Sequence, residues 1–494
     1  MNEFQGKTAA VIGLARAGAP AAKFLAQRGA RVIGFDGKTR ENLSAEALEL
    51  ETLGVELQLG EHGFAGIESC DLIVLSPGLK VHFEPLKSLI ADAEARGSEV
   101  IGELELAYRF CPCPIIGVTG TKGKSTTTKL ITEMLQACGV EAISAGNTGT
   151  PLISVLPQLK SESRAVVEVS SFQLEKAPTF RPKIAVLLSL LEDHQDYHPT
   201  LEQYWETKLK IFANQESGDH AVFNVDDERV KLAWWHGDIE ALSKTRFFQD
   251  DHAFKDVFVV PVSSKEAKDL DPNIEPQVVV CSHDGGICIK NAAYLLNKDR
   301  FEPVIASEEI PLKGVHNLSN VAAAIAVVRE VVAFDKNKEK IANAIRNFQT
   351  LPHRLEIVAR KDGITWVNDS QSTIPDASIA ALKSFPSPVT LLVGGRAKIE
   401  ASAYEGLMRA VRDANAKLAL FGEAAEMLFE VAVTQGVEKS QIVREKTLAE
   451  ALRVAKIRAS NDETVILSPA CASFDQFTSY EHRGETFRQL VREM

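Results

Sequence analysis

The sequence is poor in cysteine, and the cysteines that it has outline neither a disulfide framework nor a zinc site. Seven cysteines are scattered through 494 residues, and only Cys111 and Cys113 stand close together. Because no second pair follows at zinc-ligand spacing, we expect free thiols in a reducing compartment.

Long apolar runs are also missing. No N-terminal stretch combines a basic start with an apolar run, and nowhere do about 18 apolar residues follow one another, as a membrane-spanning helix requires. We therefore expect a cytoplasmic protein without membrane insertion.

The chain has no surplus of positive charge either. Its formal net charge is −12, and no basic stripe interrupts the acidic background. This balance argues against a nucleic-acid partner. Small phosphorylated ligands remain compatible with it, because a few local cations and helix N-termini are enough to bind them.

The chain does contain enough apolar material for several cores, with 45% hydrophobic residues. Its length predicts about three domains. Short apolar runs that end at Gly, Pro or Asp alternate with helical stretches, which is typical of parallel sheets covered by helices. The predicted strands are residues 7–12, 31–35, 71–75, 165–169, 184–188, 389–395 and 464–469, and a helix is expected around 317–332.

Two proline-containing joints divide this α/β pattern. Cys-Pro-Cys-Pro at 111–114 and Leu-Pro-His-Arg at 351–354 are incompatible with a continuous helix. We therefore predict three domains, at residues 1–110, 111–350 and 351–494. The polar stretch 229–307 carries no motif that points to a function.

The first domain begins with a strand, a glycine turn, a helix and a second strand ending at Asp36, which is typical of a Rossmann-like half. As a dinucleotide site the turn from Gly13 to Gly18 is weak, because its middle position is Ala15 where the backbone would approach a pyrophosphate. Another phosphate-bearing ligand stays compatible. Asp36 can accept a hydrogen bond from a ribose or a base, or it can simply be solvated.

The most informative segment is the glycine-rich turn from Gly117 to Ser125, between an apolar run and a helix-like segment. Its backbone N–H groups can surround phosphate oxygens, Lys124 can reach the β- and γ-phosphates, and the Ser125 hydroxyl can bind Mg²⁺. The usual phosphate-loop spacing would require glycine at 118, where this chain has Val118. A glycine turn without a ligand is the alternative, but it leaves the Lys-Ser-Thr-Thr-Thr run unexplained.

Acidic residues and histidines follow two later strands of the central domain. Glu168 ends an apolar strand, where an unpaired carboxylate is costly, and Glu192, Asp193, His194, Asp196 and His198 follow the next strand. A zinc cluster or a plain polar loop is possible, but oxygen ligands beside a nucleotide loop favour Mg²⁺. The spacing around Lys208 indicates only an amphipathic helix, on which a lone lysine is usually a surface charge.

Taken together, these segments resemble the Mur ligase family over nearly the whole chain. The matching motifs are Gly-Val-Thr-Gly-Thr-x-Gly-Lys-Ser at 117–125, Ala-Gly-Asn-x-Gly at 145–149, Glu-Val-Ser-Ser-Phe-Gln-Leu-Glu at 168–175, Glu-Asp-His at 192–194, Lys-Leu-Lys-Ile at 208–211, Gly-Val-His-Asn-x-x-Asn at 314–320, His-Arg-Leu-Glu at 353–356, Asn-Asp-Ser at 368–370 and Ser-Pro-Ala-Cys-Ala-Ser-Phe-Asp-Gln-Phe at 468–477. The family shares the offset glycine spacing, which removes the objection raised by Val118.

The resemblance implies an α/β fold with a Rossmann-like N-terminal domain, a central phosphate-loop mononucleotide-binding domain with a mostly parallel sheet, and a Rossmann-like C-terminal domain. It also implies a reaction in which ATP phosphorylates a carboxylate and an amine attacks the acyl phosphate. A tetrahedral intermediate then loses phosphate and leaves an amide. The implied substrates are UDP-N-acetylmuramoyl-L-alanine and D-glutamate, with a monomeric enzyme closing its last domain over them during peptidoglycan precursor synthesis.

The resemblance also assigns site residues, which fall into five groups. Those that hold ATP are Gly117, Thr119, Gly120, Thr121, Lys122, Gly123, Lys124, Ser125, Thr126, Asn317, Asn320, Arg354 and Asp369. Those that hold the UDP substrate are Gly13, Leu14, Ala15, Arg16, Asp36, Ser76, Pro77, Gly78 and Asn147. Those that receive the amino acid are Thr373, Lys398, Ser473 and Tyr480, the last through its backbone. Two Mg²⁺ sites use Ser125, Glu168, His194 and Lys208, and the catalytic residues are Lys124, His194 and Lys208.

Lys208 matches the family's carbamylated lysine, in which CO₂ turns an ammonium into an anionic oxygen ligand. Three positions depart from the family pattern: Lys122 replaces Asn, Gln371 replaces Lys, and Tyr480 replaces a common Phe. Of these, Gln371 removes a positive charge next to the predicted glutamate pocket.

Four alternatives compete with this assignment. A ligase of the same family with another amino acid remains open, although the Asp-Asn-Pro-Arg run expected of the diaminopimelate-adding branch is missing. Folylpolyglutamate synthase lacks a UDP-binding first domain. A phosphate-loop switch protein explains neither the last domain nor Lys208, and an NAD oxidoreductase is disfavoured by Ala15.

Overall fold

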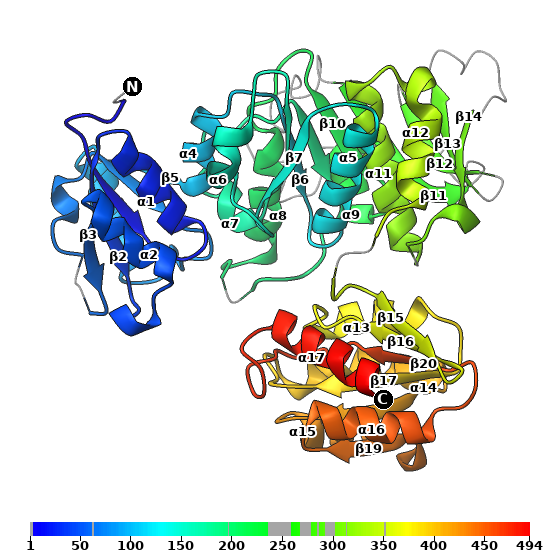
Figure 1. Ribbon diagram of the computed structural model, residues 1–494. Helices are drawn as coiled ribbons and strands as arrows, with labels where there is room; N and C mark the ends of the chain where they lie inside the picture. Colours follow the sequence, from blue (N-terminus) through cyan, green and yellow to red (C-terminus); the bar gives the residue numbers. More distant parts are fainter. Residues whose placement is uncertain are drawn as a thin grey trace. The chain divides into compact units, whose positions relative to one another are not determined.

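The structure is a computed structural model that describes residues 3–61, 64–195, 197–235, 258–266, 278–283, 286–291, 302–312, 314–349 and 352–494 (Figure 1). The chain forms two compact units. The first contains residues 1–310 and 316–348, and the second contains residues 311–315 and 349–494.

The first unit begins with a five-stranded sheet of order β3-β2-β1-β4-β5, in which every pair is parallel. Its strands are β1 (Thr8–Ile12), β2 (Arg31–Asp36), β3 (Glu56–Leu59), β4 (Leu72–Leu75) and β5 (Glu99–Gly102). The accompanying helices are α1 (Gly18–Gln27), α2 (Ala45–Glu49), α3 (Leu86–Ala95) and α4 (Glu103–Arg109). This arrangement confirms the Rossmann-like first domain.

A nine-stranded sheet of order β14-β13-β12-β11-β10-β9-β6-β8-β7 follows in the same unit. Its strands are β6 (Ile115–Thr119), β7 (Ala142–Gly146), β8 (Arg164–Glu168), β9 (Ile184–Leu187), β10 (His220–Asn224), β11 (Phe258–Glu266), β12 (Val278–His283), β13 (Gly286–Asn291) and β14 (Glu302–Ala306). Only the β12-β13 and β13-β14 pairs are antiparallel. The sheet is therefore mostly parallel, as predicted for the central domain.

The helices of this part are α5 (Lys124–Ala137), α6 (Leu152–Val155), α7 (Ser171–Leu174), α8 (Leu201–Leu209), α9 (Glu228–Trp235), α11 (Val315–Val331) and α12 (Phe334–Arg346). Of the polar stretch 229–307, the structure describes all but the first residue of α9, the strands β11 to β14 and a residue next to β14; the remainder lies outside the described residues.

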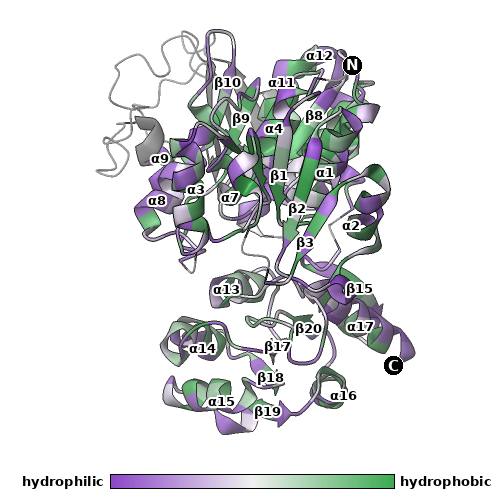
Figure 2. Cartoon of the chain, turned by 90° about the vertical axis from the view of Figure 1, so that its left-hand side faces the viewer, coloured by the Kyte–Doolittle hydropathy of each residue, from purple (hydrophilic) through white to green (hydrophobic). Residues whose placement is uncertain are grey.

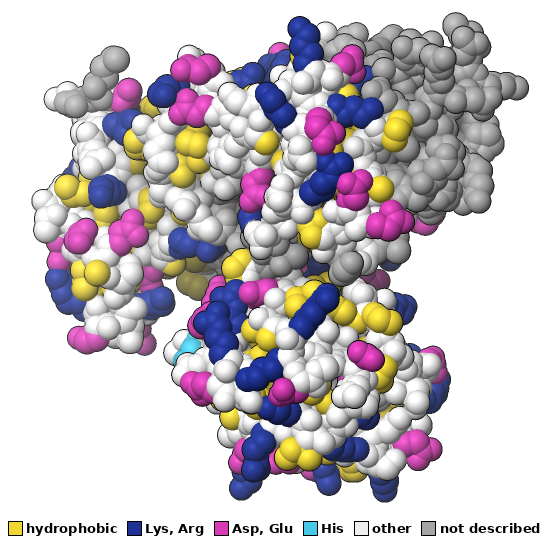
Figure 3. All heavy atoms as spheres, turned by 45° about the vertical axis from the view of Figure 1, so that its right-hand side comes forward, with side chains coloured by type: hydrophobic (Ala, Val, Ile, Leu, Met, Phe, Trp, Pro, Cys, Tyr) yellow, Lys and Arg dark blue, Asp and Glu magenta, His cyan; other side chains and the backbone are white. Residues whose placement is uncertain are grey.

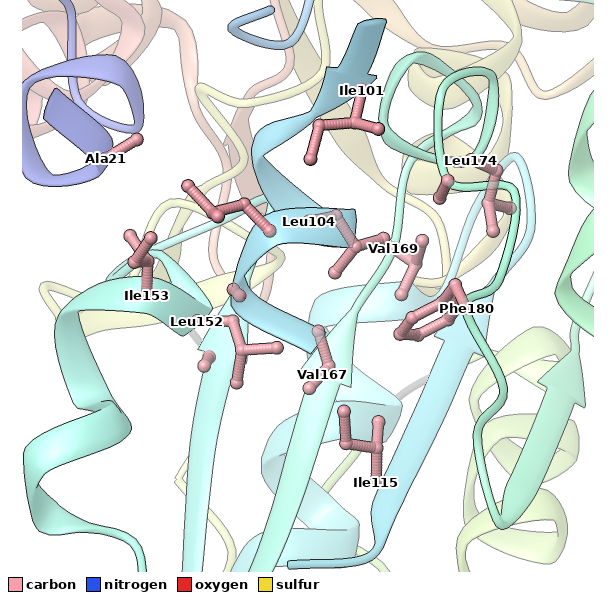
Figure 4. Packing of buried hydrophobic residues seen from close by; sticks show 14 of the residues in the cluster. Ala21, Ile101, Leu104, Ile115, Leu152, Ile153, Val167, Val169, Leu174 and Phe180 are labelled. Carbon is pink, nitrogen blue, oxygen red and sulfur yellow. The ribbon is translucent and has the colours of Figure 1, made fainter. Parts of the chain in front are cut away.

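The two sheets of the first unit share one hydrophobic core. Leu104 of α4 lies among side chains of β5, α6 and the residue after β8, with Ile101, Leu152 and Val169 around it (Figure 4). All are essentially inaccessible to solvent. The boundary predicted after residue 110 therefore follows a helix that packs on both sheets, and it stays a prediction.

The second unit holds a six-stranded sheet of order β15-β16-β20-β17-β18-β19, antiparallel only between β15 and β16. Its strands are β15 (Glu356–Lys361), β16 (Ile364–Asn368), β17 (Val389–Gly394), β18 (Lys417–Phe421), β19 (Ile442–Glu445) and β20 (Thr464–Leu467). Its helices are α13 (Pro375–Lys383), α14 (Glu405–Asp413), α15 (Ala425–Thr434), α16 (Leu448–Arg458) and α17 (Tyr480–Glu493). Two separate hydrophobic clusters line this sheet, so the predicted α/β last domain is confirmed.

Burial explains why the strands read as apolar runs rather than as alternating patterns. Parallel strands are covered on both faces, and the inner strands of all three sheets are buried along nearly their whole length. Figure 2 shows β1 mainly in the hydrophobic colour. On the face shown in Figure 3, basic and acidic side chains are interspersed. Within the described part of the chain, no helix has both the length and the apolar character needed to cross a membrane.

Candidate active site

The glycine turn from Gly117 to Ser125 lies between the carboxyl end of β6 and the first turn of α5. Gly120 has φ 148°, and a Cβ there would lie 3.0 Å from the backbone nitrogen of Ser189. Gly123 has φ 86°, and a Cβ there would lie 2.4 Å from Oδ1 of Asn320. The positive φ disfavours any other residue at both positions, and the short distance at Gly123 places α11 directly against the turn.

Asn317 and Asn320 of α11 lie next to the turn, as predicted for two nucleotide residues. Asn320 donates a hydrogen bond of 3.0 Å to Oδ1 of Asn317, and both side chains are buried. Ser125 and Thr126, at the start of α5, are also largely buried. The turn, the first residues of α5 and α11 therefore form one polar wall around a helix N-terminus, which is a favourable place for phosphate.

Two lysines converge on one carbonyl of this turn. Nζ of Lys124 lies 2.9 Å from the Gly120 oxygen and 3.1 Å from the Thr121 oxygen, and Nζ of Lys208 lies 3.1 Å from the same Gly120 oxygen. Lys208 is only 2% exposed. The expectation of a surface charge, drawn from helical spacing, was therefore wrong: this face of α8 packs on the sheet.

Tyr204 is a neighbour of Lys208 that the sequence reasoning missed. Its ring lies 4.6 Å from Nζ of Lys208, and its hydroxyl donates to Oγ1 of Thr121 at 3.1 Å. Burial lowers the pKa of Lys208 well below its usual value, and the nearby Lys124 lowers it further. A larger share of neutral amine follows, which is the nucleophilic form of a lysine.

Glu168 ends β8 and lies near this turn with its carboxylate almost fully buried, at 3% exposure. Oε1 accepts hydrogen bonds from Oγ1 of Thr148 at 2.8 Å and Nδ2 of Asn147 at 3.3 Å. Gly146 must be glycine, because a Cβ would lie 2.1 Å from the Glu168 carbonyl oxygen. The guanidinium of Arg16, from the first sheet, donates to the backbone oxygen of Asn147. The predicted UDP-substrate residues and the predicted metal residue are thus joined through Asn147.

The two histidines that follow β9 lie in different environments. His194 has φ 55° and a side chain that is 41% exposed, and its ring packs edge-on against Phe172 at 4.8 Å. His198 is buried instead, with its Nε2 3.0 Å from Oγ of Ser171. His198 is thus a core residue, whereas the side chain of His194 reaches the surface. Asp196 lies outside the described residues.

Lys122, one of the departures from the family pattern, forms an ion pair with Asp193. The ammonium of Lys122 lies 3.6 Å from Oδ2 of Asp193, and its backbone N–H donates to Oγ of Ser189 at 3.0 Å. Although burial alone would raise the pKa of Asp193, the cations Lys122 and Lys124 and the neighbouring His194 bring it below its usual value. Lys122 therefore offsets an acid of the same site.

The donor set fits Mg²⁺ better than zinc. Among the described residues, no three His, Cys, Asp or Glu side chains gather closely enough to hold a metal by themselves. The candidate ligands are one buried carboxylate, one imidazole, one hydroxyl and Lys208 after addition of CO₂. Such an oxygen-rich, incomplete set suits hard cations that keep several waters: Ser125 would hold one, and Glu168, His194 and Lys208 would hold another.

The predicted UDP-substrate turn lies at the carboxyl edge of the first sheet, after β1, β2 and β4. Asp36 is partly buried, and its carboxylate is bound to the backbone of this turn: Oδ2 accepts from the Leu14 N–H at 2.8 Å and Oδ1 from the Lys38 N–H at 2.9 Å. Ser76 donates to the carbonyl oxygen of Gly13 at 2.6 Å. Asp36 therefore shapes the turn itself. Ala15, Pro77 and Gly78 lie in the same loops.

In the second unit the predicted residues gather in the loops after β16, β17 and β20, at one edge of the sheet. Nζ of Lys398 donates to Oγ1 of Thr373 at 3.3 Å. Ser370 donates to the backbone oxygen of Tyr480 at 2.8 Å, and Ser473 is buried in the loop after β20. Cations and hydroxyls at one edge are what a dicarboxylate substrate requires.

Asp369, predicted to contact ATP together with Arg354, is buried in this second unit. Its carboxylate accepts from Oγ of Ser468 at 2.8 Å and from the Leu355 N–H at 3.2 Å. Burial raises the pKa of Asp369 to about 6, and these hydrogen bonds only partly offset the effect. Asp369 also ties the loop of Arg354 to β20.

Arg483 is a further residue that the sequence reasoning missed. It is 0% exposed, and its guanidinium donates to Oγ and the backbone oxygen of Ser370, at 3.0 and 2.9 Å, and to the Cys471 oxygen at 3.1 Å. Burial lowers the pKa of Arg483 to about 10. The sequence signal for this close packing was the neighbouring Gly484, a glycine inside a helix. A Cβ at Gly484 would lie 2.2 Å from Nδ1 of His353. Arg483 thus joins the loops that carry Thr373 and Ser473.

We expect Asp369→Asn to change how stability depends on pH. The folded-state pKa of about 6 lies above the ordinary value of 3.8, so the folded protein binds this proton more tightly than the unfolded chain. Its contribution is fully present below pH 3.8 and is lost as the pH rises to about 6. Two pKa units correspond to about 3 kcal/mol, so Asp369→Asn should gain about that much relative to the wild type between pH 4 and pH 7.

Urea unfolding across this pH range measures the difference. The exposed Asp462, also in the second unit, supplies the control Asp462→Asn, whose stability difference from the wild type should stay constant. A constant difference for Asp369→Asn as well would contradict the prediction.

Known protein families match the chain along most of its length. The Mur ligase MurD-like N-terminal domain matches residues 7–102, the Mur ligase middle domain matches residues 118–240, and the Mur ligase glutamate ligase domain matches residues 353–471. These ranges fall on the three sheets in order.

Curated relatives match nearly end to end. UDP-N-acetylmuramoylalanine–D-glutamate ligase from Pelotomaculum thermopropionicum is 37% identical over 493 residues, covering 99% of this chain and 98% of the relative. The enzyme of the same name from Geotalea uraniireducens is 36% identical over 492 residues, with 100% and 98% covered.

Solved structures share the fold at low identity. UDP-N-acetylmuramate–alanine ligase from Thermotoga maritima has a TM-score of 0.56 at 14% identity, with 99% of each chain covered. MurF ligase from the same organism, in complex with ADP, has a TM-score of 0.54 at 17% identity, with 86% of this chain and 96% of that chain covered. The chain belongs to the Mur ligase family.

Proposed function

We propose that this chain is an ATP-dependent ligase that joins D-glutamate to UDP-N-acetylmuramoyl-L-alanine during peptidoglycan precursor synthesis in the cytoplasm. The observation that carries the proposal is the end-to-end identity of 37% to a relative with this activity in its name. The geometry supports it, because a phosphate-binding turn in the first unit is accompanied by a cationic and hydroxyl-rich loop edge in the second.

The first chemical step transfers a phosphoryl group. A carboxylate oxygen of UDP-N-acetylmuramoyl-L-alanine attacks the γ-phosphorus of ATP, and the bond to the bridging oxygen breaks to release ADP. Lys124 and the N–H groups of the turn stabilise the charge on the phosphoryl oxygens. When bound, Mg²⁺ at Ser125, and a second ion at Glu168, His194 and Lys208, would neutralise the negative charges that repel each other.

Lys208 would hold the second ion in its carbamylated form. A buried ammonium beside Lys124 repels a cation, whereas a neutral amine adds CO₂, releases a proton and becomes an anionic ligand. The lowered pKa of Lys208 favours this neutral amine. Tyr204 and the Gly120 carbonyl hold the side chain in place.

The second step forms the amide. The amine of glutamate attacks the acyl carbon, a tetrahedral intermediate forms, and phosphate leaves as the amine loses its proton. Lys398, Thr373, Ser473 and the backbone of Tyr480 bind the two carboxylates of glutamate. Arg483 holds the loops that carry Thr373 and Ser473 in register. The partners are thus small molecules, and we propose a monomeric enzyme.

Phosphate release in matched reactions tests the assignment. We expect release from ATP only when UDP-N-acetylmuramoyl-L-alanine and D-glutamate are both present. Reactions with L-glutamate or diaminopimelate in place of D-glutamate serve as controls. Equal rates with either amino acid would replace the D-glutamate assignment by another activity of the same family, and release without any acceptor would favour a nucleotide switch.

A further inference from the structure

Gln371 connects two predicted subsites of the second unit. It follows β16, and its side chain is half-buried. Oε1 accepts a hydrogen bond from Nε of Arg354, which we assign to the nucleotide. Nε2 donates to the hydroxyl of Tyr480, at 3.3 Å, in the helix start that we assign to glutamate.

Arg354 depends on this contact because its own backbone lies in an unusual turn. The residues on either side, His353 and Leu355, have φ values of 64° and 43°, a region that costs energy for side chains other than glycine. The loop after β16 supports the turn, since the Gln371 N–H donates to the His353 oxygen at 3.2 Å and Asp369 accepts from Leu355. Gln371 thus fixes both the backbone and the guanidinium of Arg354.

Tyr480 is held from both ends in the same way. It is the first residue of α17, whose preceding Ser479 caps the helix by accepting from the His482 N–H. Ser370 donates to the backbone oxygen of Tyr480, and Gln371 donates to its hydroxyl. The direction of the Tyr480 side chain and the position of its backbone therefore depend on two adjacent residues of one loop.

The chemistry of this link requires a carboxamide. Its carbonyl end accepts from a cation and its amino end donates to a hydroxyl, whereas a lysine has no acceptor and a methionine offers neither group at comparable strength. Gln371 and Tyr480 are two of the three positions at which this sequence departs from the Mur ligase pattern. The structure places these two departures in contact.

We propose that Gln371 is a positioning residue that links the nucleotide-binding Arg354 to the glutamate-binding helix start at Tyr480. This inference rests on the proposed function. It predicts that one side chain affects the KM for two chemically unrelated substrates, because each end of the amide orients a residue of a different subsite.

Steady-state kinetics of the full chain with Gln371→Met tests the link. We expect the KM for ATP to rise about tenfold, the scale of a lost hydrogen bond to a charged group. The KM for D-glutamate should rise about threefold, the scale of a neutral hydrogen bond. The KM for UDP-N-acetylmuramoyl-L-alanine, whose predicted residues lie in the first unit, should stay unchanged.

Two further variants test the two ends of the Gln371 carboxamide separately. Tyr480→Phe should raise only the KM for D-glutamate, and combining it with Gln371→Met should add nothing further to that KM. Gln371→Glu keeps an acceptor for Arg354, so the KM for ATP should return to the wild-type value. The KM for D-glutamate should stay raised, because a carboxylate repels the substrate.

The exposed Gln489 on the same helix as Tyr480 gives the matched control Gln489→Met, which should equal the wild type in all three KM values. Additive effects of Gln371→Met and Tyr480→Phe, or an unchanged KM for ATP in Gln371→Met, would overturn the link. The wild type reports separately on the proposed function: if it does not use D-glutamate, that function fails. The KM for ATP with the amino acid that is used then still decides the role of Gln371.

Discussion

Replacing Lys208 with alanine should reduce turnover by at least about 100-fold, the scale on which losing one charge-stabilising group slows an enzyme. Lys210→Ala should stay within about twofold of the wild type, since exposed substitutions rarely matter. The two lysines are two residues apart, yet Lys208 is buried with Nζ 3.1 Å from the Gly120 oxygen, whereas Lys210 is exposed at the end of α8. Phosphate release at saturating substrates measures the difference.

A carbamate on Lys208 has a second expected consequence, which is a dependence of turnover on CO₂. Turnover of the wild type should fall in CO₂-depleted buffer and recover on addition of bicarbonate, because the adduct forms reversibly on the neutral amine. Lys208→Met, which fills the same space, should be as slow as Lys208→Ala and insensitive to bicarbonate. Equal losses in Lys208→Ala and Lys210→Ala would remove the assignment of Lys208 as a metal ligand.

The fold could be predicted from the sequence because its parallel strands are buried on both faces. The runs at β1, β4, β9, β17 and β20 are mostly apolar, and all of them except β9 end at Gly or at a Ser-Pro pair. The glycine turn was also predictable, since the φ values of 148° at Gly120 and 86° at Gly123 are local backbone conformations that favour glycine.

The environment of each polar residue was harder to predict, because it comes from segments distant in sequence. Lys208 reads as a surface lysine until α8 packs against a turn 88 residues earlier. From the sequence Asp36 can be a solvated acid, whereas in the structure it accepts a hydrogen bond from the Leu14 N–H. From the sequence Arg483 is one more charge on an amphipathic helix, whereas in the structure its guanidinium donates hydrogen bonds to two loops. In each case the hydropathy pattern describes only the residue's own segment, whereas the environment of its side chain depends on a segment that is distant in sequence.

Replacing Glu168 with glutamine should raise the Mg²⁺ concentration required for turnover by at least about tenfold, since even the outer partners of metal ligands change metal affinity by that much. The carboxamide oxygen can still accept from Thr148 and Asn147, so the structure of the loop after β7 should persist. What is lost is the negative charge, which a cation between phosphate and carboxylate groups needs for neutralisation.

The control for this prediction lies in the neighbouring loop. Glu192 has a side chain that is 59% exposed and lies 3.7 Å from Arg229, so Glu192→Gln should leave the Mg²⁺ dependence unchanged. Titrating Mg²⁺ at fixed ATP distinguishes the two variants, with thermal unfolding as the check on folding. If Glu168→Gln required no more Mg²⁺ than Glu192→Gln, the buried carboxylate would have to be assigned to holding Asn147 and Thr148 in place, and the second cation would need another anionic ligand.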